Sequence, residues 1–207
     1  MERLTVGMLD TNCYLLSGDL DPQRVLVIDP GAQGKRILEA VGQRTVEAVL
    51  LTHGHFDHTG ALGAFRDRPV YLGRADAEML GEPEESAGFL IGDRAERRCV
   101  TLHPLEGGES LSFPGFSAPV RVVATPGHTP GGMSYVILGE IYSGDTLFRH
   151  SWGRTDFPGG SAAALDQSIR TLLALPGNMK VHPGHDLDTD LKSERAFFAL
   201  GCGPLTM

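Results

Sequence analysis

Three histidines and one aspartate fall within six residues of this sequence, in the segment His53-Gly54-His55-Phe56-Asp57-His58. This segment directly follows the apolar run Ala48-Val49-Leu50-Leu51, which predicts a buried strand that ends in a loop. Several buried imidazole rings need hydrogen-bond partners or a metal ion. His53 and His55, two residues apart on an extended loop, can point toward one cation, whereas Asp57 and His58, displaced by the turn, can serve a second. Imidazole and carboxylate ligands suit zinc, iron or manganese rather than calcium.

The same pattern, an apolar strand that delivers one histidine or aspartate to a loop, occurs three more times. His128 follows Val122-Val123-Ala124 within a turn rich in proline and glycine, Asp145 follows Tyr142-Ser143-Gly144, and His185 follows Val181-His182-Pro183-Gly184. One such residue alone is typical of a turn or cap, but loops held by a rigid scaffold commonly carry functional residues. A solvated histidine-rich turn is the alternative interpretation, and the mid-chain position argues against it. The pattern gives seven candidate ligands, enough for two ions that share one carboxylate: His53, His55, Asp57, His58, His128, Asp145 and His185.

The remainder of the sequence has the composition of a globular protein, with 41% apolar and 21% charged residues. We predict one domain over residues 1–207, because no linker-like segment divides the chain. The 27 glycines and 13 prolines are scattered, which favours many short elements. The predicted strands are 3–7, 13–17, 24–28, 46–51, 70–72, 111–113, 120–124, 133–138, 140–143 and 180–181, and the predicted helices are 34–41, 58–65, 74–80, 161–175 and 192–200. The two halves of the chain are rich in predicted strands with helices at intervals, which predicts two sheets covered by helices. The polar residues 82–98 predict a loop on the surface or a lid.

Charge and cysteine content exclude several classes of partner. With 26 acidic and 18 basic residues the formal charge is −8, which argues against a nucleic-acid partner. We expect no membrane contact and no secretory signal, because no long apolar run is present. Three cysteines without a CxxC spacing, Cys13, Cys99 and Cys202, predict neither a disulfide framework nor a thiolate site and fit a cytoplasmic protein. A small-molecule substrate is the expected partner, and a homo-oligomer is possible.

The segment from Thr52 to His58, followed in order by His128, Asp145 and His185, resembles the metallo-β-lactamase superfamily. The resemblance extends from Thr11-Asn12-Cys13-Tyr14 to His185 and implies an α/β fold, an αββα sandwich with its site at the edge where the two sheets meet. It implies that His53, His55 and His128 hold one ion, that Asp57, His58 and His185 hold a second, and that Asp145 bridges them. Two divalent ions, zinc in the first place with iron or manganese as alternatives, would lower the pKa of a shared water toward ~7, so that a hydroxide attacks a carbonyl. Asp57 would orient this nucleophile, and no GxSxG motif offers a serine in its place.

Within the superfamily, Gly144-Asp145-Thr146-Leu147-Phe148 and the segment from Gly153 to Gly160 resemble the glyoxalase II-like hydrolases and also the persulfide dioxygenases. The first resemblance implies cleavage of a small thioester or ester. It makes Arg154 a candidate contact for the substrate, with an Arg154–Asp156 pair that braces the loop as the alternative. The second implies a dioxygenase with one iron at His53, His128 and Asp145.

Other features separate the chain from known subgroups. Only 22 residues follow His185, so we expect none of the helical domain with which glyoxalase II grips glutathione. A β-lactamase or lactonase, a nuclease and a non-catalytic metal-binding module are further alternatives, although β-lactamases commonly have cysteine at the position of Asp145. Asp29 follows a predicted strand and is expected to cap a turn or to support a ligand. His103, His150 and His182 lack ligand spacing and are expected on the surface or in loops.

Overall fold

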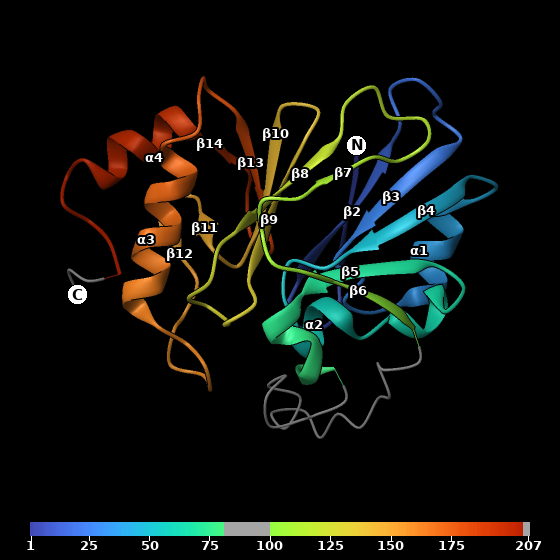
Figure 1. Cartoon of the computed structure of the whole chain (residues 1–207), viewed down its shortest axis with the longest axis horizontal. Helices are drawn as coiled ribbons and strands as arrows, with labels where there is room; N and C mark the ends of the chain where they lie inside the picture. The colour runs from blue at the N-terminus through green and yellow to red at the C-terminus, as the bar shows by residue number, and fades with distance from the viewer. Residues whose placement is uncertain (81–99, 205–207) are drawn as a thin grey trace.

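The computed structural model describes residues 1–80 and 100–204 of the chain. In this part of the chain two six-stranded sheets lie between helices at the two sides of the molecule (Figure 1). The first sheet has the order β1-β2-β3-β4-β5-β6, with bounds β1 (Glu2–Val6), β2 (Thr11–Ser17), β3 (Arg24–Ile28), β4 (Thr45–Leu50), β5 (Pro69–Gly73) and β6 (Thr101–Leu105). The second has the order β14-β13-β10-β9-β8-β7, with bounds β7 (Ser110–Leu111), β8 (Val120–Ala124), β9 (Met133–Ile137), β10 (Glu140–Gly144), β13 (Lys180–Pro183) and β14 (Thr189–Asp190).

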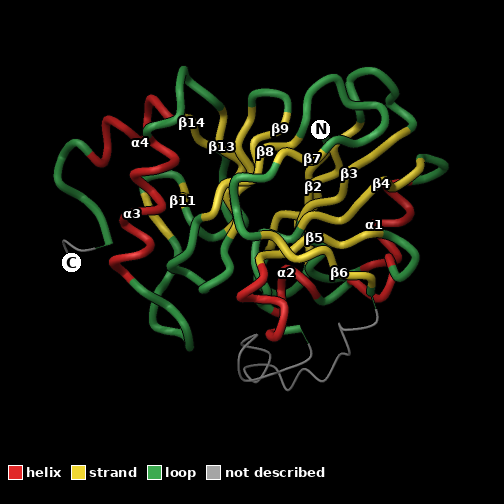
Figure 2. Tube along the Cα trace, viewed as in Figure 1, coloured by secondary structure: helices red, strands yellow, loops and turns green. Residues whose placement is uncertain are grey.

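Short helices connect and cover these strands (Figure 2). The α-helices are α1 (Gly34–Val41), α2 (Phe56–Thr59), α3 (Ala162–Leu173) and α4 (Leu191–Phe198), and the 3₁₀ helices are η1 (Leu62–Phe65) and η2 (Arg74–Met79). A small hairpin of β11 (Leu147–Phe148) and β12 (Ser151–Trp152) lies between β10 and α3 in the sequence. Within the described residues, every helix is too short or too polar to cross a lipid bilayer.

The alternation of side chains along the strands builds three apolar layers. In β2, Tyr14 and Leu16 pack with residues of β8, β9 and β10 between the two sheets, whereas Cys13 and Leu15 pack with α1 and η1 on the other face. In the second sheet, the outward face of β9, β10 and β13 packs against Leu165, Ile169 and Leu172 of α3 and Leu191 of α4. The layers therefore run helix, sheet, sheet, helix, and the predicted αββα sandwich is confirmed.

The element boundaries differ from the prediction in a few places. The predicted helix 58–65 is two pieces, α2 and η1, separated at Gly60 and Ala61, and the predicted helix 74–80 is the 3₁₀ helix η2. The strands β6, β11, β12 and β14 were not predicted, because three of them are only two residues long and β6 has no clear apolar alternation. The predicted lid at 82–98 lies outside the described residues. Ser161 caps α3 as expected, since its Oγ accepts a hydrogen bond from the backbone N–H of Ala164 at 3.3 Å.

Strand direction decides where the candidate ligands meet. β8 and β10 both pair antiparallel with β9, and β10 pairs parallel with β13, so β8, β10 and β13 all run in the same direction. Their carboxyl ends therefore lie at one edge of the second sheet. The two sheets are joined at this edge by backbone hydrogen bonds, from Met133 N to Thr52 O at 2.8 Å and from Asn12 N to Gly184 O at 2.7 Å. The loop after β4 of the first sheet thus lies beside the loops after β8, β10 and β13.

Candidate metal centre

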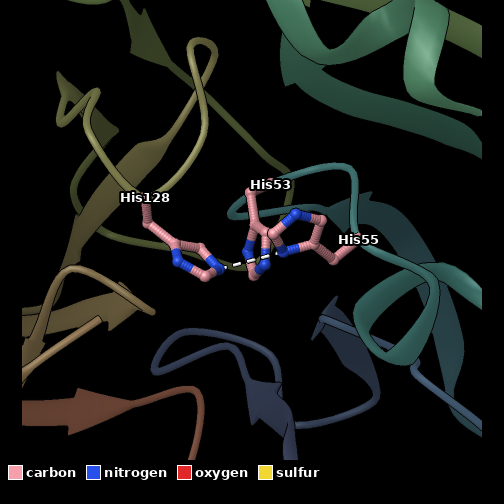
Figure 3. A group of neighbouring side chains, drawn as sticks. All are labelled: His53, His55 and His128. Carbon is pink, nitrogen blue, oxygen red and sulfur yellow. Dashed lines mark hydrogen bonds between the residues drawn. The ribbon is translucent and has the colours of Figure 1, made fainter. Parts of the chain in front are cut away.

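Three buried histidines form the first half of the site (Figure 3). His53 and His55 come from the loop after β4, and His128 comes from the loop after β8. Each is at most 5% exposed, and one ring nitrogen from each lies within 4.8 Å of the others. His55 Nδ1 is 2.9 Å from His128 Nε2. This is the spacing of donors that share one ion, and it agrees with the first group expected from the sequence.

Asp57, His58 and His185 form the second half. The single turn of α2 begins at Phe56, whose ring is buried, and it turns both following side chains toward the loop after β13. His58 Nε2 is 3.3 Å from Asp57 Oδ2, and His185 Nε2 is 3.2 Å from the same oxygen. The three ligand atoms lie within 4.8 Å of one another.

Asp145 lies between the two halves, in the loop after β10. Its Oδ2 is 3.5 Å from His128 Nε2 and 3.5 Å from His185 Nε2, and its Oδ1 is 3.5 Å from His58 Nε2. One carboxylate therefore contacts a histidine of each group. All seven candidate residues are brought together, and their binding of metal remains a prediction.

Hydrogen bonds outside the cluster fix the orientation of three rings. Each ring donates its Nδ1–H to an oxygen: His58 to Asp29 Oδ2 at 2.9 Å, His128 to Arg154 O at 2.7 Å, and His185 to Leu9 O at 3.0 Å. The proton on Nδ1 leaves the lone pair of Nε2 directed into the cluster, as metal-binding histidines require. Asp29 thus supports a ligand, and it also accepts hydrogen bonds from Thr52 N and Thr52 Oγ1 at 2.8 and 2.7 Å.

Unpaired polar atoms show that the cluster fits a cation. Among the described residues, the buried side-chain atoms without a hydrogen-bond partner are His53 Nε2, His55 Nε2, Asp145 Oδ1 and His182 Nδ1, so three of the four belong to this cluster. A buried polar atom without a partner is costly, and a bound metal ion removes that cost. Imidazole nitrogens with carboxylate oxygens form a donor set suited to zinc, iron or manganese.

The protonation of the cluster supports the same conclusion. Burial lowers the pKa of His53 well below its usual value, and burial together with His128 lowers the pKa of His55 to about 3, so both rings are neutral donors. Burial also lowers the pKa of His58, but Asp57, Asp145 and Asp29 outweigh burial and raise that pKa well above its usual value. The carboxylates therefore draw positive charge into the site, where a divalent cation can take the place of the proton.

A cavity of about 440 Å³ opens onto the cluster. Its lining combines site residues with apolar ones, namely Leu9, His55, Phe56, Asp57, His128, Asp145, Phe148, Gly153, Arg154, Phe157 and His185. Arg154 binds Asp156 through two hydrogen bonds of 2.7 Å and covers the ring of Phe157 at 3.9 Å from its centroid. Its hydrogen bonds lower the pKa of Asp156 to about 2, so the pair is fully charged at neutral pH. The Arg154–Asp156 pair, expected as the alternative to a substrate contact, is therefore present. Arg154 also lines the cavity.

Several supporting residues were not predicted from the sequence. Thr11 Oγ1 donates to Asp57 Oδ2 at 2.8 Å, and the Asn12 amide donates to the carbonyls of Pro183 and Asp186, on either side of His185, at 3.1 Å. Asp76 accepts three hydrogen bonds from the loops that carry the first group. Single threonine, asparagine or aspartate residues carry no spacing signal, although Thr11 and Asn12 lie in a segment that already supported the family resemblance.

The remaining histidines correct one expectation. His103 lies exposed on β6 and stacks on Tyr71, and the side chain of His150 is half exposed, as expected. The expectation for His182 is wrong, because this residue is only 1% exposed and lies within β13. It stacks on Tyr142 and its Nε2 is 3.0 Å from Glu140 Oε2, so a neighbouring carboxylate makes its burial possible.

Comparison with known proteins identifies the family to which the chain belongs. The model of the metallo-beta-lactamase superfamily matches residues 6–185. The chain belongs to the metallo-β-lactamase superfamily. It is 36% identical over 202 residues to a probable metallo-hydrolase, YqgX of Bacillus subtilis, with 93% of each chain covered.

Two solved structures of superfamily proteins are similar in both fold and sequence. The BLEG-1 B3 metallo-β-lactamase superposes with a TM-score of 0.84 at 34% identity, over 94% of this chain and 96% of that one. TTHA1623 in a di-iron-bound form superposes with a TM-score of 0.82 at 34% identity, over 94% and 97% of the two chains. With its histidine and aspartate cluster, the protein is a metal-dependent hydrolase of this superfamily.

Proposed function

We propose that the protein uses two metal ions to hydrolyse a small thioester or a related ester, in the manner of the glyoxalase II-like hydrolases that it resembles. The observation that carries the proposal is the position of Asp145, whose carboxylate is 3.5 Å from His128 of the first group and 3.5 Å from His58 and His185 of the second. A carboxylate in this position can be shared by two ions. Paired ions ~3.5–4 Å apart are typical of hydrolytic metalloenzymes.

The two groups of side chains described above would each hold one ion. His53, His55 and His128 would hold one ion, Asp57, His58 and His185 the other, and zinc is the proposed metal. Bound ions would polarise the substrate carbonyl and make hydroxide available at neutral pH. Iron is an alternative, because the similar protein TTHA1623 was solved in a di-iron-bound form.

The residues around the ions would position the reactants. Asp57 lines the cavity and can accept a hydrogen bond from the attacking water, while Thr11 Oγ1 holds Asp57 Oδ2 at 2.8 Å. The side chains of Phe56 and Phe157 line the cavity and would shield one side of a bound carbonyl from bulk water. A site that excludes water strengthens the electrostatic interactions within it.

The cavity favours a neutral, apolar substrate over an acidic one. Leu9, Phe148 and Phe157 line it, and the cation among its described lining residues, Arg154, is already paired with Asp156. An acidic substrate would have to compete with Asp156 for the guanidinium. We therefore propose that a glutathione tail contributes little to recognition, and that Arg154 contributes weakly to binding of the substrate.

One assay set tests the proposal. Zinc-loaded protein is given a short neutral acyl thioester or S-lactoylglutathione, and the released thiol is measured by its absorbance after reaction with a chromogenic thiol reagent. We expect hydrolysis of both with comparable kcat/KM. Turnover of neither ester by the zinc-loaded protein, with oxygen consumed on glutathione persulfide by the iron-loaded protein, would overturn the proposal in favour of the dioxygenase.

Hydrolysis of β-lactams is a second candidate, favoured by the likeness to BLEG-1 in fold and sequence. The same zinc-loaded protein is therefore also given a chromogenic cephalosporin. A kcat/KM for the cephalosporin that exceeds the values for both thioesters would favour this candidate.

A further inference from the structure

Asp76 is a buried carboxylate that lies outside the ligand set. It is 0% exposed and belongs to η2, the 3₁₀ helix that follows β5. Its Oδ2 accepts hydrogen bonds from Gly54 N at 3.0 Å and from Thr129 Oγ1 at 2.7 Å, and its Oδ1 accepts one from Gly131 N at 2.6 Å. Both oxygens therefore have partners.

All three donors belong to the two loops that carry the first group of histidines. Gly54 lies between His53 and His55, and Thr129 and Gly131 closely follow His128. These loops come from β4 in one sheet and β8 in the other, and no β-ladder joins these two strands. One carboxylate thus links the two chain segments whose separation decides whether three imidazoles can share an ion.

The backbone of η2 is in close contact with both loops. A Cβ on Gly131 would lie 2.5 Å from Asp76 N, and a Cβ on Gly54 would lie 2.9 Å from Met79 Cβ and 3.1 Å from Asp76 O. At Gly131 only glycine permits this approach, because real Cβ atoms do not come so close to a backbone atom, and at Gly54 a Cβ would have to displace the side chain of Met79. The carboxylate is therefore held at a fixed place between the loops.

Burial of this carboxylate is unfavourable for the fold by itself. Burial raises the pKa of Asp76, and the hydrogen bonds from Thr129, Gly131 and Gly54 only partly counter this effect. An ionised group in such a place is retained only where donors satisfy it. The loops supply these donors, and the carboxylate in turn supplies acceptors for backbone N–H groups that no strand partner satisfies.

We propose that Asp76 is a positioning residue for the three-histidine group: by joining the two loops it sets the separation of His53 and His55 from His128, and with it the affinity of this group for metal. The inference rests on the proposed metal centre and is independent of which bond the enzyme cleaves. Supporting residues of this kind typically change metal affinity about 10- to 100-fold when they are substituted.

The test is a zinc titration of chains in which one group has been disabled. In a His185→Ala background only the three-histidine group keeps all its ligands, and in a His55→Ala background only the second group does. Asp76→Asn preserves the size of the side chain but replaces one oxygen with an NH₂ that faces Gly54 N–H or Gly131 N–H. Competition with a chromophoric chelator should show a loss of zinc affinity of about 10- to 100-fold in the first background and less than about twofold in the second.

Controls separate positioning from a general loss of structure. Asp67→Asn, the same change at an exposed residue, should alter neither affinity. Thr129→Val removes one of the three hydrogen bonds and should weaken the three-histidine group by about three- to tenfold, which decides the matter if Asp76→Asn does not fold. Melting of the zinc-free chains reports folding separately.

Equal weakening in the two backgrounds would overturn the proposal, as would unchanged affinity in the His185→Ala background. No substrate enters this experiment, so failure of the thioesterase proposal cannot be mistaken for failure here.

Discussion

The apolar lining of the cavity predicts how activity depends on acyl length. Leu9, Phe148 and Phe157 line the space next to the cluster, and the ring of Phe157 is held between Arg154, 3.9 Å from its centroid, and His55, 5.7 Å away ring to ring. An acyl chain placed at the metal cluster would extend along these side chains. Each added methylene should therefore strengthen binding until the cavity is full, and Phe157→Ala should weaken this dependence.

The magnitude follows from the burial of methylene groups. A fully buried methylene contributes about 0.8 kcal/mol, which is about a fourfold change in kcat/KM. A cavity open to solvent on one side buries about half of each group, which gives about twofold. From an acetyl to a hexanoyl thioester, four methylenes, kcat/KM should therefore rise by roughly 16- to 250-fold. Removal of the Phe157 ring should reduce the increment to less than about 1.5-fold per methylene.

The assay is thiol release from a series of straight-chain acyl thioesters with one common neutral thiol. Plotting log kcat/KM against acyl length gives the increment for the native chain, for Phe157→Ala and for Phe197→Ala, a half-buried phenylalanine of α4 that does not line the cavity. The control should retain the native slope. A flat or falling plot for the native chain, or an unchanged slope in Phe157→Ala, would refute the inference that the apolar residues bind the acyl group.

Three further predictions concern the metal centre and its charge. Metal analysis of protein purified without chelator should give well over one equivalent per chain, because two complete ligand groups are present; a single iron that added zinc or manganese leaves unchanged would contradict this. Asp145→Ala should cost both metals and nearly all activity, since this carboxylate contacts both groups, while His103→Ala on the exposed face of β6 should cost neither; similar losses would mean that the ligands are wrongly assigned. Asp156→Asn should free Arg154 and lower KM for S-lactoylglutathione by about two- to fivefold, and Arg154→Ala should raise the same KM by a smaller factor. An equal change in KM for a neutral thioester would exclude a charge effect.

Much of the fold was predictable because most strands are short apolar runs that glycine, proline and polar turn residues separate. The predicted bounds of α1, β3 and β8 match the structure, and the burial of Cys13 follows from its place in β2. The repeated pattern of an apolar strand followed by one ligand predicted that His128, Asp145 and His185 act together, and the common direction of β8, β10 and β13 in the structure is what brings them to one edge of the sheet.

Apart from the supporting role expected for Asp29, the supporting contacts could not be predicted, because they depend on tertiary distances. Thr11 is 46 residues from Asp57, and Asp76 is 53 residues from Thr129, so local spacing carries no information about either hydrogen bond. The pairing of Arg154 with Asp156 was available as an alternative because the two lie two residues apart. His182 was expected on the surface or in a loop, because it has no ligand spacing. It is buried instead, since the neighbouring strand β10 supplies the carboxylate of Glu140 as a partner.

The loop from Thr52 to His58 combines deep burial with an irregular backbone, and buried carboxylates explain how both are possible. A loop without strand partners has backbone N–H groups that must find acceptors when water is excluded. Asp29 accepts from Thr52 N and Asp76 accepts from Gly54 N, so the loop is held before and within its ligand pair. Asp29 also fixes the ring of His58. The carboxylates that stabilise the loop also favour positive charge in the site, as the raised pKa of His58 shows, so the contacts that hold this loop also favour the cation that its histidines are arranged to bind.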